Sequence, residues 1–555
     1  MADTTWDSGS SGPPVWDSGR SGPPAWDREV DVVVLGTGAA GLTAALTAAA
    51  SGASVAVFEK APTVGGTTAV SGGIVWVPAH DRAAGGELTV EDALKYLEAQ
   101  SLGVMDRELV ETFVRTGPEM LDFVEGNSAL QFEVAEGFPD YKPELPGGQP
   151  GGGRSLNARP FDLATLDDWA SRITSFPIDF SNVGIDAETR ARIHAAVDDM
   201  DGDYCVAGTA LIAGLLKGLL DLGVTPVTEA RAMELIGSAS TITGVRIALG
   251  DKEIRVRAEK AVILGTGGFE WDQRLVEAYL RGPLRGPVSP PNNTGDGLRM
   301  AMAHGADLAN MGEAWWVPVI QIPGDTLGGR PRSRSVRLER TRPRSIIVNR
   351  FGKRFLNEAG EYNSMSGPFH QLDPRLGYVN DPAWIVFDDQ HLKRYGFLGV
   401  EPGGEAPDWF NKAATLAELE EKTGIDADGL SATLSVWNDN VGAEIDPEFG
   451  RGASAYDGYW GDNSASTPAL QTLGPLDTPP YYAVPVGIGA MGTKGGPRTD
   501  RDGRVLHVSG APIPGLFAAG NAMAGVTGRA YGGAGGTLGP AMVFGYRAGL
   551  AAASR

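Results

Sequence analysis

The sequence predicts an α/β fold in which several parallel strands end in glycine-rich turns. Residues 30–60 read VDVVVLGTGAAGLTAALTAAASGASVAVFEK, and the uninterrupted apolar run Val32–Leu35 is typical of a strand buried on both faces. A stretch of Ala, Leu and Thr of helical length follows, and ASVAVFEK reads as a second strand. Two later segments, AEKAVILGTGGFE and IPGLFAAGNAMAG, again pass from an apolar strand into glycine. This alternation of strand and helix indicates a Rossmann-like domain.

The turn GTGAAG has the spacing of a dinucleotide-binding site. We expect Gly36 to form the tight turn, Gly38 to let the backbone approach a pyrophosphate, and Gly41 to let the helix pack on the strand. The N-terminus of that helix offers free N–H groups and a positive dipole to the phosphates. Glu59 ends the second strand about twenty residues beyond the glycines, where an acidic residue accepts a hydrogen bond from a ribose hydroxyl.

Two further features favour FAD over NAD as the cofactor. The segment GGTT, Gly65–Thr68, follows the second strand and offers another cradle of glycine and hydroxyl groups. The strand Leu516–Ala518, near the C-terminus, leads into Gly520 and Asn521. A site assembled from both ends of the chain suits a long cofactor that lies extended across one sheet. The residues predicted to bind FAD are Gly36, Gly38, Ala39, Ala40, Gly41, Glu59, Lys60, Gly65, Gly66, Thr67, Thr68, Ser71, Gly72, Gly73, Ala230, Thr266, Gly267, Gly268, Asp296, Gly520, Asn521, Gly536, Thr537 and Leu538.

The composition excludes several classes of protein. At 555 residues the chain is too long for one ordinary core, so two domains are expected. The net charge of −22 argues against binding to nucleic acid or to an anionic membrane. With Cys205 as the single cysteine and six scattered histidines, we expect no disulfide and no metal site. No apolar run reaches the roughly 20 residues of a transmembrane helix, and the composition fits a cytoplasmic protein.

The predicted order is a tail, an FAD-binding domain and an inserted domain. Residues 1–27 carry an imperfect repeat, WDSGSSGPPV then WDSGRSGPPA, whose Ser, Gly and Pro content predicts a disordered tail without an export signal. We expect residues 28–315 and 489–555 to form the FAD-binding domain. Residues 316–488 then form a capping domain between these two segments.

From residue 30 to residue 550 these motifs resemble the flavoproteins of the fumarate reductase and succinate dehydrogenase superfamily. The resemblance implies a glutathione-reductase-like FAD domain, an inserted α+β capping domain, and a flavin ring that lies between the two. Members with covalent FAD carry a histidine in the segment that matches GGTTAVSGG, and this chain has none there, so noncovalent FAD is expected. Because the chain has only one dinucleotide fingerprint and no haem motif, we expect an external acceptor, quinone-like or a flavoprotein, to reoxidise the flavin.

Four segments are similar to the 3-ketosteroid Δ1-dehydrogenases, a branch of the same superfamily. They are SGGIVWVP, GFPDYKPELPGGQPGGGRSLNARPFD, GKRFLNEAGEYNS and TGRAYGGAGGTLGPA. The resemblance maps the active-site tyrosines of that family on Tyr141, Tyr362 and Tyr531, and its backbone donor on Gly535. It implies an enzyme that removes two hydrogens from adjacent carbons of a ketone-bearing ring. The sequence departs from the family at YGGAGG, where many relatives place a proline after the tyrosine.

Desaturation of a ketone requires these groups. A hydrogen next to a ketone is too weakly acidic to be removed unaided, so donors on the ketone oxygen must stabilise the developing charge. Tyr531 O–H and Gly535 N–H are the predicted donors, which explains a phenol surrounded by glycine. Tyr362 is the predicted base, helped by a hydrogen bond from Tyr141. In a 3-ketosteroid the proton leaves C2, and the second hydrogen leaves C1 as a hydride to flavin N5.

Two other functions stay open. A smaller cyclic ketone, such as an oxocyclohexane carboxylate or cyclohexanone, fits the same tyrosines, and a fumarate-type reductase fits the superfamily. The run Arg330–Arg344 is consistent with a site for a substrate carboxylate, with an arginine proton donor, or with a solvated basic loop. Trp76, Trp315 and Trp316 either line an apolar pocket at the domain junction or belong to the core.

Overall fold

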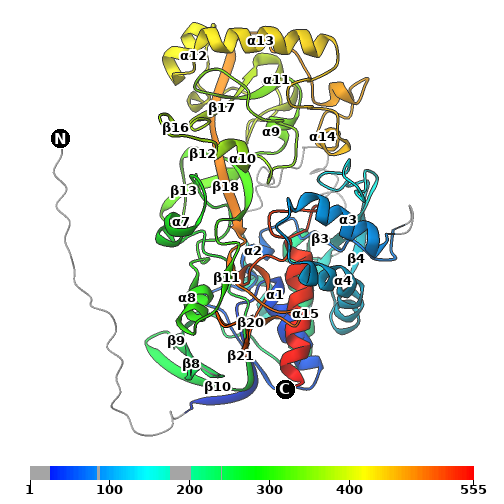
Figure 1. Ribbon diagram of the computed structural model, residues 1–555, viewed down its shortest axis with the longest axis vertical. Helices are drawn as coiled ribbons and strands as arrows, with labels where there is room; N and C mark the ends of the chain where they lie inside the picture. The colour runs from blue at the N-terminus through cyan, green and yellow to red at the C-terminus, as the bar shows by residue number, and fades with distance from the viewer. Residues whose placement is uncertain (1–25, 84–87, 176–201, 239–240) are drawn as a thin grey trace, which may run out of the picture.

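The computed structural model describes residues 26–83, 88–175, 202–238 and 241–555. Its central sheet has the strand order β2-β1-β10-β21-β20, and the antiparallel pair β8 and β9 extends it beside β10. The α/β fold class predicted from the sequence is confirmed, and Figure 1 shows this sheet in the lower half of the molecule. The strands are β1 (Arg28–Leu35), β2 (Val55–Phe58), β8 (Ala230–Ser238), β9 (Thr241–Leu249), β10 (Lys252–Leu264), β20 (Arg504–Leu506) and β21 (Pro512–Ala518).

The three strands that the sequence predicted to end in glycine lie side by side. β10 pairs in parallel with both β1 and β21, so Leu264 lies opposite Leu35 on one side and Ala518 on the other. The carboxyl ends of parallel strands meet at one edge of the sheet, where open α/β folds bind their ligands. The glycine-rich turns that follow these strands therefore share that edge.

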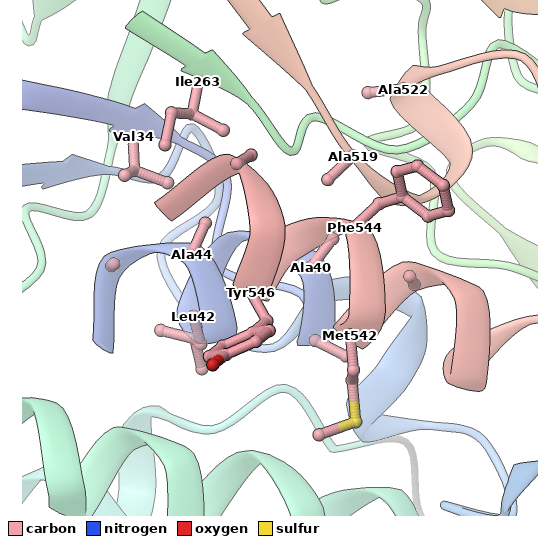
Figure 2. Close-up of a cluster of buried hydrophobic side chains, with 14 of the residues drawn as sticks. Val34, Ala40, Leu42, Ala44, Ile263, Ala519, Ala522, Met542, Phe544 and Tyr546 are labelled. Atoms are coloured by element: carbon pink, nitrogen blue, oxygen red, sulfur yellow. The ribbon is translucent and has the colours of Figure 1, made fainter. Parts of the chain in front are cut away.

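Helices α1 (Ala39–Ala50) and α15 (Leu538–Ala553) bring the two ends of the chain together. Figure 2 shows part of their shared core, in which small residues of α1 are buried together with side chains of the sheet and of α15. A Cβ at Gly545 of α15 would come within 2.5 Å of the Ala40 carbonyl oxygen, so the absence of a side chain allows this close approach. The first turns of both helices line the same cleft.

A second sheet is antiparallel and has the strand order β13-β12-β18-β17-β14. Helices α11, α12 and α13 accompany it, and Figure 1 shows α12 and α13 at the end of the molecule far from the first sheet. The predicted domain boundaries, at residues 315 and 489, fall within the paired strands β12 and β18 and stay a prediction. The elements are β12 (Ala314–Leu327), β13 (Arg330–Ser335), β14 (Ser345–Asn349), β17 (Ala383–Asp388), β18 (Tyr481–Thr493), α11 (Asp389–Tyr395), α12 (Leu416–Thr423) and α13 (Ala427–Gly442).

A small antiparallel sheet, β3-β5-β4, lies next to helices of the first domain. Most of the predicted tail, residues 1–25, lies outside the described residues, whereas the Asp27 N–H donates to the Arg255 carbonyl oxygen of β10 at 2.9 Å. No helix in the described part of the chain is long and apolar enough to cross a membrane. Other elements are α2 (Gly66–Ala69), β3 (Val75–Trp76), α3 (Val90–Gln100), α4 (Arg107–Asn127), β4 (Phe132–Glu136), β5 (Gly152–Ala158), α6 (Ala207–Asp221), α7 (Gln273–Tyr279), α8 (Asp296–Ala303), α9 (Leu338–Thr341), α10 (Ser366–Phe369) and α14 (Ala455–Tyr459).

Candidate active site

A cleft at the carboxyl edge of the parallel sheet is lined by backbone and small side chains. Gly36 has a φ of 101°, and a Cβ there would lie 2.3 Å from the Gly265 carbonyl oxygen, so only glycine fits this turn. The N-cap residue Gly38 has no side chain to cap α1, and Thr68 Oγ1 accepts a hydrogen bond from the Ala39 N–H at 3.1 Å. Among the described residues, no acceptor is within hydrogen-bonding distance of the Ala40 and Gly41 N–H groups. The N-terminus of α1 is therefore open to an anion.

Charged side chains also line the cleft. Glu59 accepts hydrogen bonds from the Thr37 N–H at 3.0 Å, the Thr37 hydroxyl at 2.7 Å and the Ala61 N–H at 2.9 Å. These bonds satisfy the buried carboxylate and fix it at the end of β2. Lys60 Nζ lies 3.0 Å from the carboxylate of Asp296, at the start of α8.

Most of the predicted cofactor residues line this cleft. The exceptions are Gly41, Gly65, Gly72, Gly73, Gly268 and Gly536, which do not line it. Several of these glycines are needed for close packing instead. For example, a Cβ at Gly41 would lie 2.1 Å from the Gly36 carbonyl oxygen. Residues that the sequence did not single out also line the cleft, namely Thr174, Ala232, Pro290, Asn292, Asn293, Met491, Ala519 and Ala541.

The three predicted tyrosines meet beside this cleft. The hydroxyls of Tyr141 and Tyr362 are 2.5 Å apart, and the Tyr362 hydroxyl donates to Tyr531 at 3.2 Å. Since a phenol has one proton to donate, Tyr141 is the donor in the first pair. All three side chains are at most 4 % exposed. The ring of Tyr531 packs on Trp315, which lines the cleft, with centroids 4.8 Å apart.

The glycine-rich loop around Tyr531 packs closely against Trp76, which only glycine allows at two positions. A Cβ at either Gly532 or Gly533 would come within 2.5 Å of the Trp76 indole. Gly535 has a φ of 93°, and a Cβ there would lie 2.4 Å from the Ile74 carbonyl oxygen. In the described part of the chain no acceptor is within reach of the Gly535 N–H, which leaves this donor available to a ligand.

The same loop is tied to the segment that carries Tyr141. The Tyr141 N–H and the Tyr96 hydroxyl both donate to the Gly532 carbonyl oxygen, at 3.0 and 2.7 Å. Asp140, which is buried, accepts from Trp76 Nε1 at 3.0 Å and pairs with Arg154 at 2.6 Å. Burial raises the pKa of Asp140, and the Arg154 charge opposes that rise. The buried pair thus fixes Tyr141 relative to the Tyr531 loop.

Tyr362 is positioned by a network of buried charges. Glu358, in the NEA segment before Tyr362, pairs with Arg354 at 2.7 Å and Arg451 at 3.2 Å. Arg340 donates to the carbonyl oxygens of Glu358 and of Gly360, the latter at 3.0 Å. Because unpaired charges are costly inside a protein, this network holds the loop in one conformation.

The interpretation of Arg330–Arg344 as a solvated basic loop is wrong. The run forms strand β13 and helix α9, and the Arg340 side chain is 1 % exposed. The Arg337 guanidinium lies 5.2 Å from the centroid of the Tyr362 ring. Arg344 pairs with Asp388, a buried acid at the end of β17. These arginines hold tertiary structure together, which local sequence could not reveal.

Burial disfavours the phenolate forms in this cluster. It raises the pKa of Tyr362 well above 10, as does the neighbouring Tyr531, whereas Arg337 and the hydrogen bond from Tyr141 lower it. Burial likewise raises the pKa of Tyr531, and the hydrogen bond from Tyr362 opposes that rise. A proton acceptor at Tyr362 therefore depends on Arg337 and Tyr141.

We expect the Arg337→Met variant to need a higher pH for activity. Without the guanidinium the pKa of Tyr362 rises further, so a smaller fraction is phenolate at neutral pH, and each unit of pKa costs about tenfold in rate. The measurement is kcat/KM against pH, with Arg337→Lys as the charge-preserving control. An unchanged pH profile in the methionine variant would remove Arg337 from this role.

Comparison with known proteins identifies the family. The profile of a family described as "FAD binding domain" matches residues 31–538. The chain belongs to this FAD-binding family. It is 43 % identical to the 4-oxocyclohexanecarboxylate 2-dehydrogenase of Sinomonas cyclohexanicum, with 94 % of this chain and 92 % of that protein covered. It is 39 % identical to the 3-oxosteroid 1-dehydrogenase of Mycolicibacterium smegmatis, over 95 % of this chain and 99 % of that protein.

A solved structure also matches the whole fold of this FAD-binding protein. It is the 3-ketosteroid Δ1-dehydrogenase from Sterolibacterium denitrificans in complex with 1,4-androstadiene-3,17-dione. The TM-score is 0.87 at 34 % identity, and 95 % of this chain and 100 % of that one are covered. The protein is thus an FAD-dependent oxidoreductase acting on CH–CH bonds, and it desaturates cyclic ketones. The resemblance noted in the sequence is confirmed.

The residues of the cleft fit FAD. The open N–H group of Ala40, which lines the cleft, suits a pyrophosphate, and the Glu59 carboxylate at the end of β2 suits a ribose. Thr537 lines the cleft, and a hydrogen bond from its hydroxyl lowers the pKa of Tyr531. Together with Trp315, this contact connects the cofactor cleft to the tyrosine cluster.

Proposed function

We propose that the protein introduces a double bond between C1 and C2 of a 3-ketosteroid, with FAD as the hydride acceptor. The observation that carries the proposal is the convergence of Tyr141, Tyr362 and Tyr531, whose hydroxyls are linked at 2.5 and 3.2 Å beside the cofactor cleft. Proteins of this activity are 38–39 % identical to the chain over nearly its full length.

The ketone oxygen binds between the Tyr531 hydroxyl and the Gly535 N–H. Tyr362 donates to Tyr531, so the Tyr531 proton remains available for the ketone. These donors stabilise the negative charge that develops on the oxygen as the neighbouring C–H bond breaks. The rigid packing of the glycine loop on Trp76 keeps the donors in place before the substrate arrives.

Tyr362 takes the proton from C2 in its phenolate form, after it has lost the hydroxyl proton that it donates to Tyr531 in the resting state. Its phenolate is favoured by the Arg337 charge and by the hydrogen bond from Tyr141. The C2–H bonding pair becomes the new C1–C2 double bond, and the hydrogen on C1 leaves with its own electron pair. Burial of all three phenols excludes water from the proton transfer.

FAD, which the residues of the cleft would hold noncovalently, would supply the acceptor for the hydride from C1. Noncovalent binding is proposed because the segment GGTTAVSGG, which includes α2, contains no histidine. An external quinone-like molecule or a second flavoprotein would then take the electrons from the reduced cofactor.

A smaller cyclic ketone that carries a carboxylate is the second candidate substrate. It is favoured by the 43 % identity to the protein named 4-oxocyclohexanecarboxylate 2-dehydrogenase. The same three phenols and the Gly535 N–H would act on this ring. In both substrates the proton to be removed is on the carbon next to the carbonyl group. The difference lies in what binds the remainder of the substrate.

Anaerobic reduction of the bound flavin separates the two candidates. The purified yellow protein is mixed with androst-4-ene-3,17-dione and, in a second sample, with 4-oxocyclohexanecarboxylate, and the absorbance of oxidised flavin is followed. We expect rapid bleaching by the steroid. Bleaching by the carboxylate alone would assign the smaller ring. If neither ketone bleaches the flavin while fumarate reoxidises the chemically reduced protein, the desaturase proposal is wrong.

A further inference from the structure

A buried lysine contacts the backbone of the loop that carries Tyr531. Lys494 follows the end of β18 and is 1 % exposed. Its ammonium donates to the carbonyl oxygens of Gly528 at 3.2 Å, Arg529 at 3.4 Å and Ala530 at 3.1 Å. Three donors thus meet three acceptors, and the three acceptors are consecutive residues immediately before Tyr531.

The same ammonium also contacts the aromatic support of Tyr531. Lys494 Nζ lies 4.1 Å from the centroid of the Trp315 ring and 5.9 Å from that of Tyr531. Trp315 in turn packs on Tyr531 and lines the cofactor cleft. Lys494 therefore touches both the backbone that precedes Tyr531 and the ring against which Tyr531 rests.

Among the residues that the structure describes, no carboxylate forms a direct ion pair with Lys494, so no such pair offsets the cost of burying its charge. The acids whose charge acts on Lys494 are Glu313 and Glu361, and they pair with Arg281 and Lys142, at 3.0 and 3.7 Å. A buried ammonium held only by carbonyl oxygens and a ring is retained where its geometry is needed.

We propose that Lys494 is a positioning residue whose ammonium form holds the Tyr531 hydroxyl and the Gly535 N–H in place for the ketone oxygen. The inference rests on the proposed function, because it assigns those two donors to the ketone. Lys494 itself does not touch the substrate. Its side chain anchors the loop at residues 528–530, whereas Trp76 packs against Gly532 and Gly533, so the loop is fixed at two places.

The proposal makes ketone binding dependent on pH. Burial, together with the charges of Arg281 and Lys142, lowers the pKa of Lys494 to about 7 against the opposing effect of Glu313 and Glu361. As the pH rises through this value, the amine loses one N–H and one of its three carbonyl contacts. The ammonium form, which orders the loop, is fully present only below the pKa, so ketone affinity falls as pH rises. The buried phenols of the cluster titrate above this range.

The test is the dissociation constant of an enone product, read from the flavin spectrum between about pH 6 and pH 9. The probes are 1,4-androstadiene-3,17-dione and 4-oxocyclohex-2-ene-1-carboxylate. In the wild type the dissociation constant should rise by at most about tenfold for each pH unit above the pKa of Lys494. In Lys494→Met it should be at least about tenfold higher at the low end and independent of pH. Lys95→Met, an exposed lysine on α3, is the matched control and should bind as the wild type does.

A second variant separates positioning from a general loss of structure. Lys494→Arg keeps a charge that does not titrate in this range, so it should retain binding at low pH and lose the pH dependence. If both variants keep the wild-type pH dependence, Lys494 does not control the loop and the inference is wrong. If the wild type binds neither enone, the proposed function fails first and this inference falls with it.

Discussion

The Tyr362→Phe variant should turn over at least about 10²-fold more slowly than the wild type, the lower end for a positioned acid–base group. Phenylalanine keeps the ring that packs beside Tyr141 and Tyr531, with centroids 5.3 and 5.6 Å away, but has no oxygen to accept the α proton. The loss should appear in kcat, because the ketone donors remain. Anaerobic flavin reduction under single-turnover conditions measures this step.

A matched control distinguishes lost chemistry from lost structure. Tyr395→Phe removes a hydroxyl at the end of α11 that donates to Asp462 at 2.7 Å and makes no hydrogen bond to the three tyrosines of the cluster, so it should leave turnover near the wild-type rate. Both variants should bind the same amount of FAD as the wild type. A near-normal rate of flavin reduction in Tyr362→Phe would remove this residue from the role of base.

Variants that disturb the two donors to the ketone oxygen should lose as much activity as Tyr362→Phe. Tyr531→Phe removes one donor, and removal of one such donor typically costs about 10²–10³ in rate. Gly535→Ala should have a comparable effect, because its Cβ would lie 2.4 Å from the Ile74 carbonyl oxygen and force the loop away from Trp76. The measurement is kcat/KM with the ketone identified by anaerobic reduction.

The glycine substitution also has a matched control. Gly510 has a φ of 88°, close to the 93° of Gly535, but a Cβ there would have no neighbour within 4 Å. Gly510→Ala therefore introduces the same backbone strain without a clash, and activity should be retained. If Gly510→Ala and Gly535→Ala lose activity equally, the effect is general backbone strain and the assignment of Gly535 as a donor loses its support.

The sequence predicted the cofactor side of the site well because that side is built from local patterns. Strand, turn and helix are contiguous from Val32 to Ala50, and the same pattern of strand and glycine recurs before Gly265 and Gly520. Each pattern specifies its own backbone conformation, and the parallel sheet then aligns the turns. The roles of residues such as Gly72 and Gly73, which do not line the cleft, depend on packing and were not separable in the sequence.

The tyrosine cluster could not be derived from spacing alone. Tyr141 and Tyr362 are 221 residues apart in the chain, and Tyr362 and Tyr531 are 169 apart. Only the resemblance of their segments to a known family joined them. Lys494 carried no such signal, because it is a single basic residue whose importance arises from its burial beside an aromatic ring. Arg337 lies in the arginine run, but nothing in the sequence distinguishes it from the other arginines there.

The interpretation of the arginine run as a solvated loop failed for a related reason. A run of basic residues in an acidic protein is usually solvated, and nothing in the local sequence shows that acids and carbonyl groups from distant segments meet it. Arg340 finds its acceptors at Glu358 and Gly360, and Arg344 finds its acid at Asp388. Burial of such charges depends on partners that the fold supplies.

The position of the ketone oxygen in a complex with the enone product tests the account most directly. A crystal structure of the FAD-loaded protein with that product should place the oxygen within about 3.2 Å of both the Tyr531 hydroxyl and the Gly535 nitrogen, the range of an ordinary hydrogen bond. The Tyr362 hydroxyl should then face the carbon next to the carbonyl group. A carbonyl oxygen bound by other donors, with Tyr531 and Gly535 out of reach, would contradict the assignment of every group in the site.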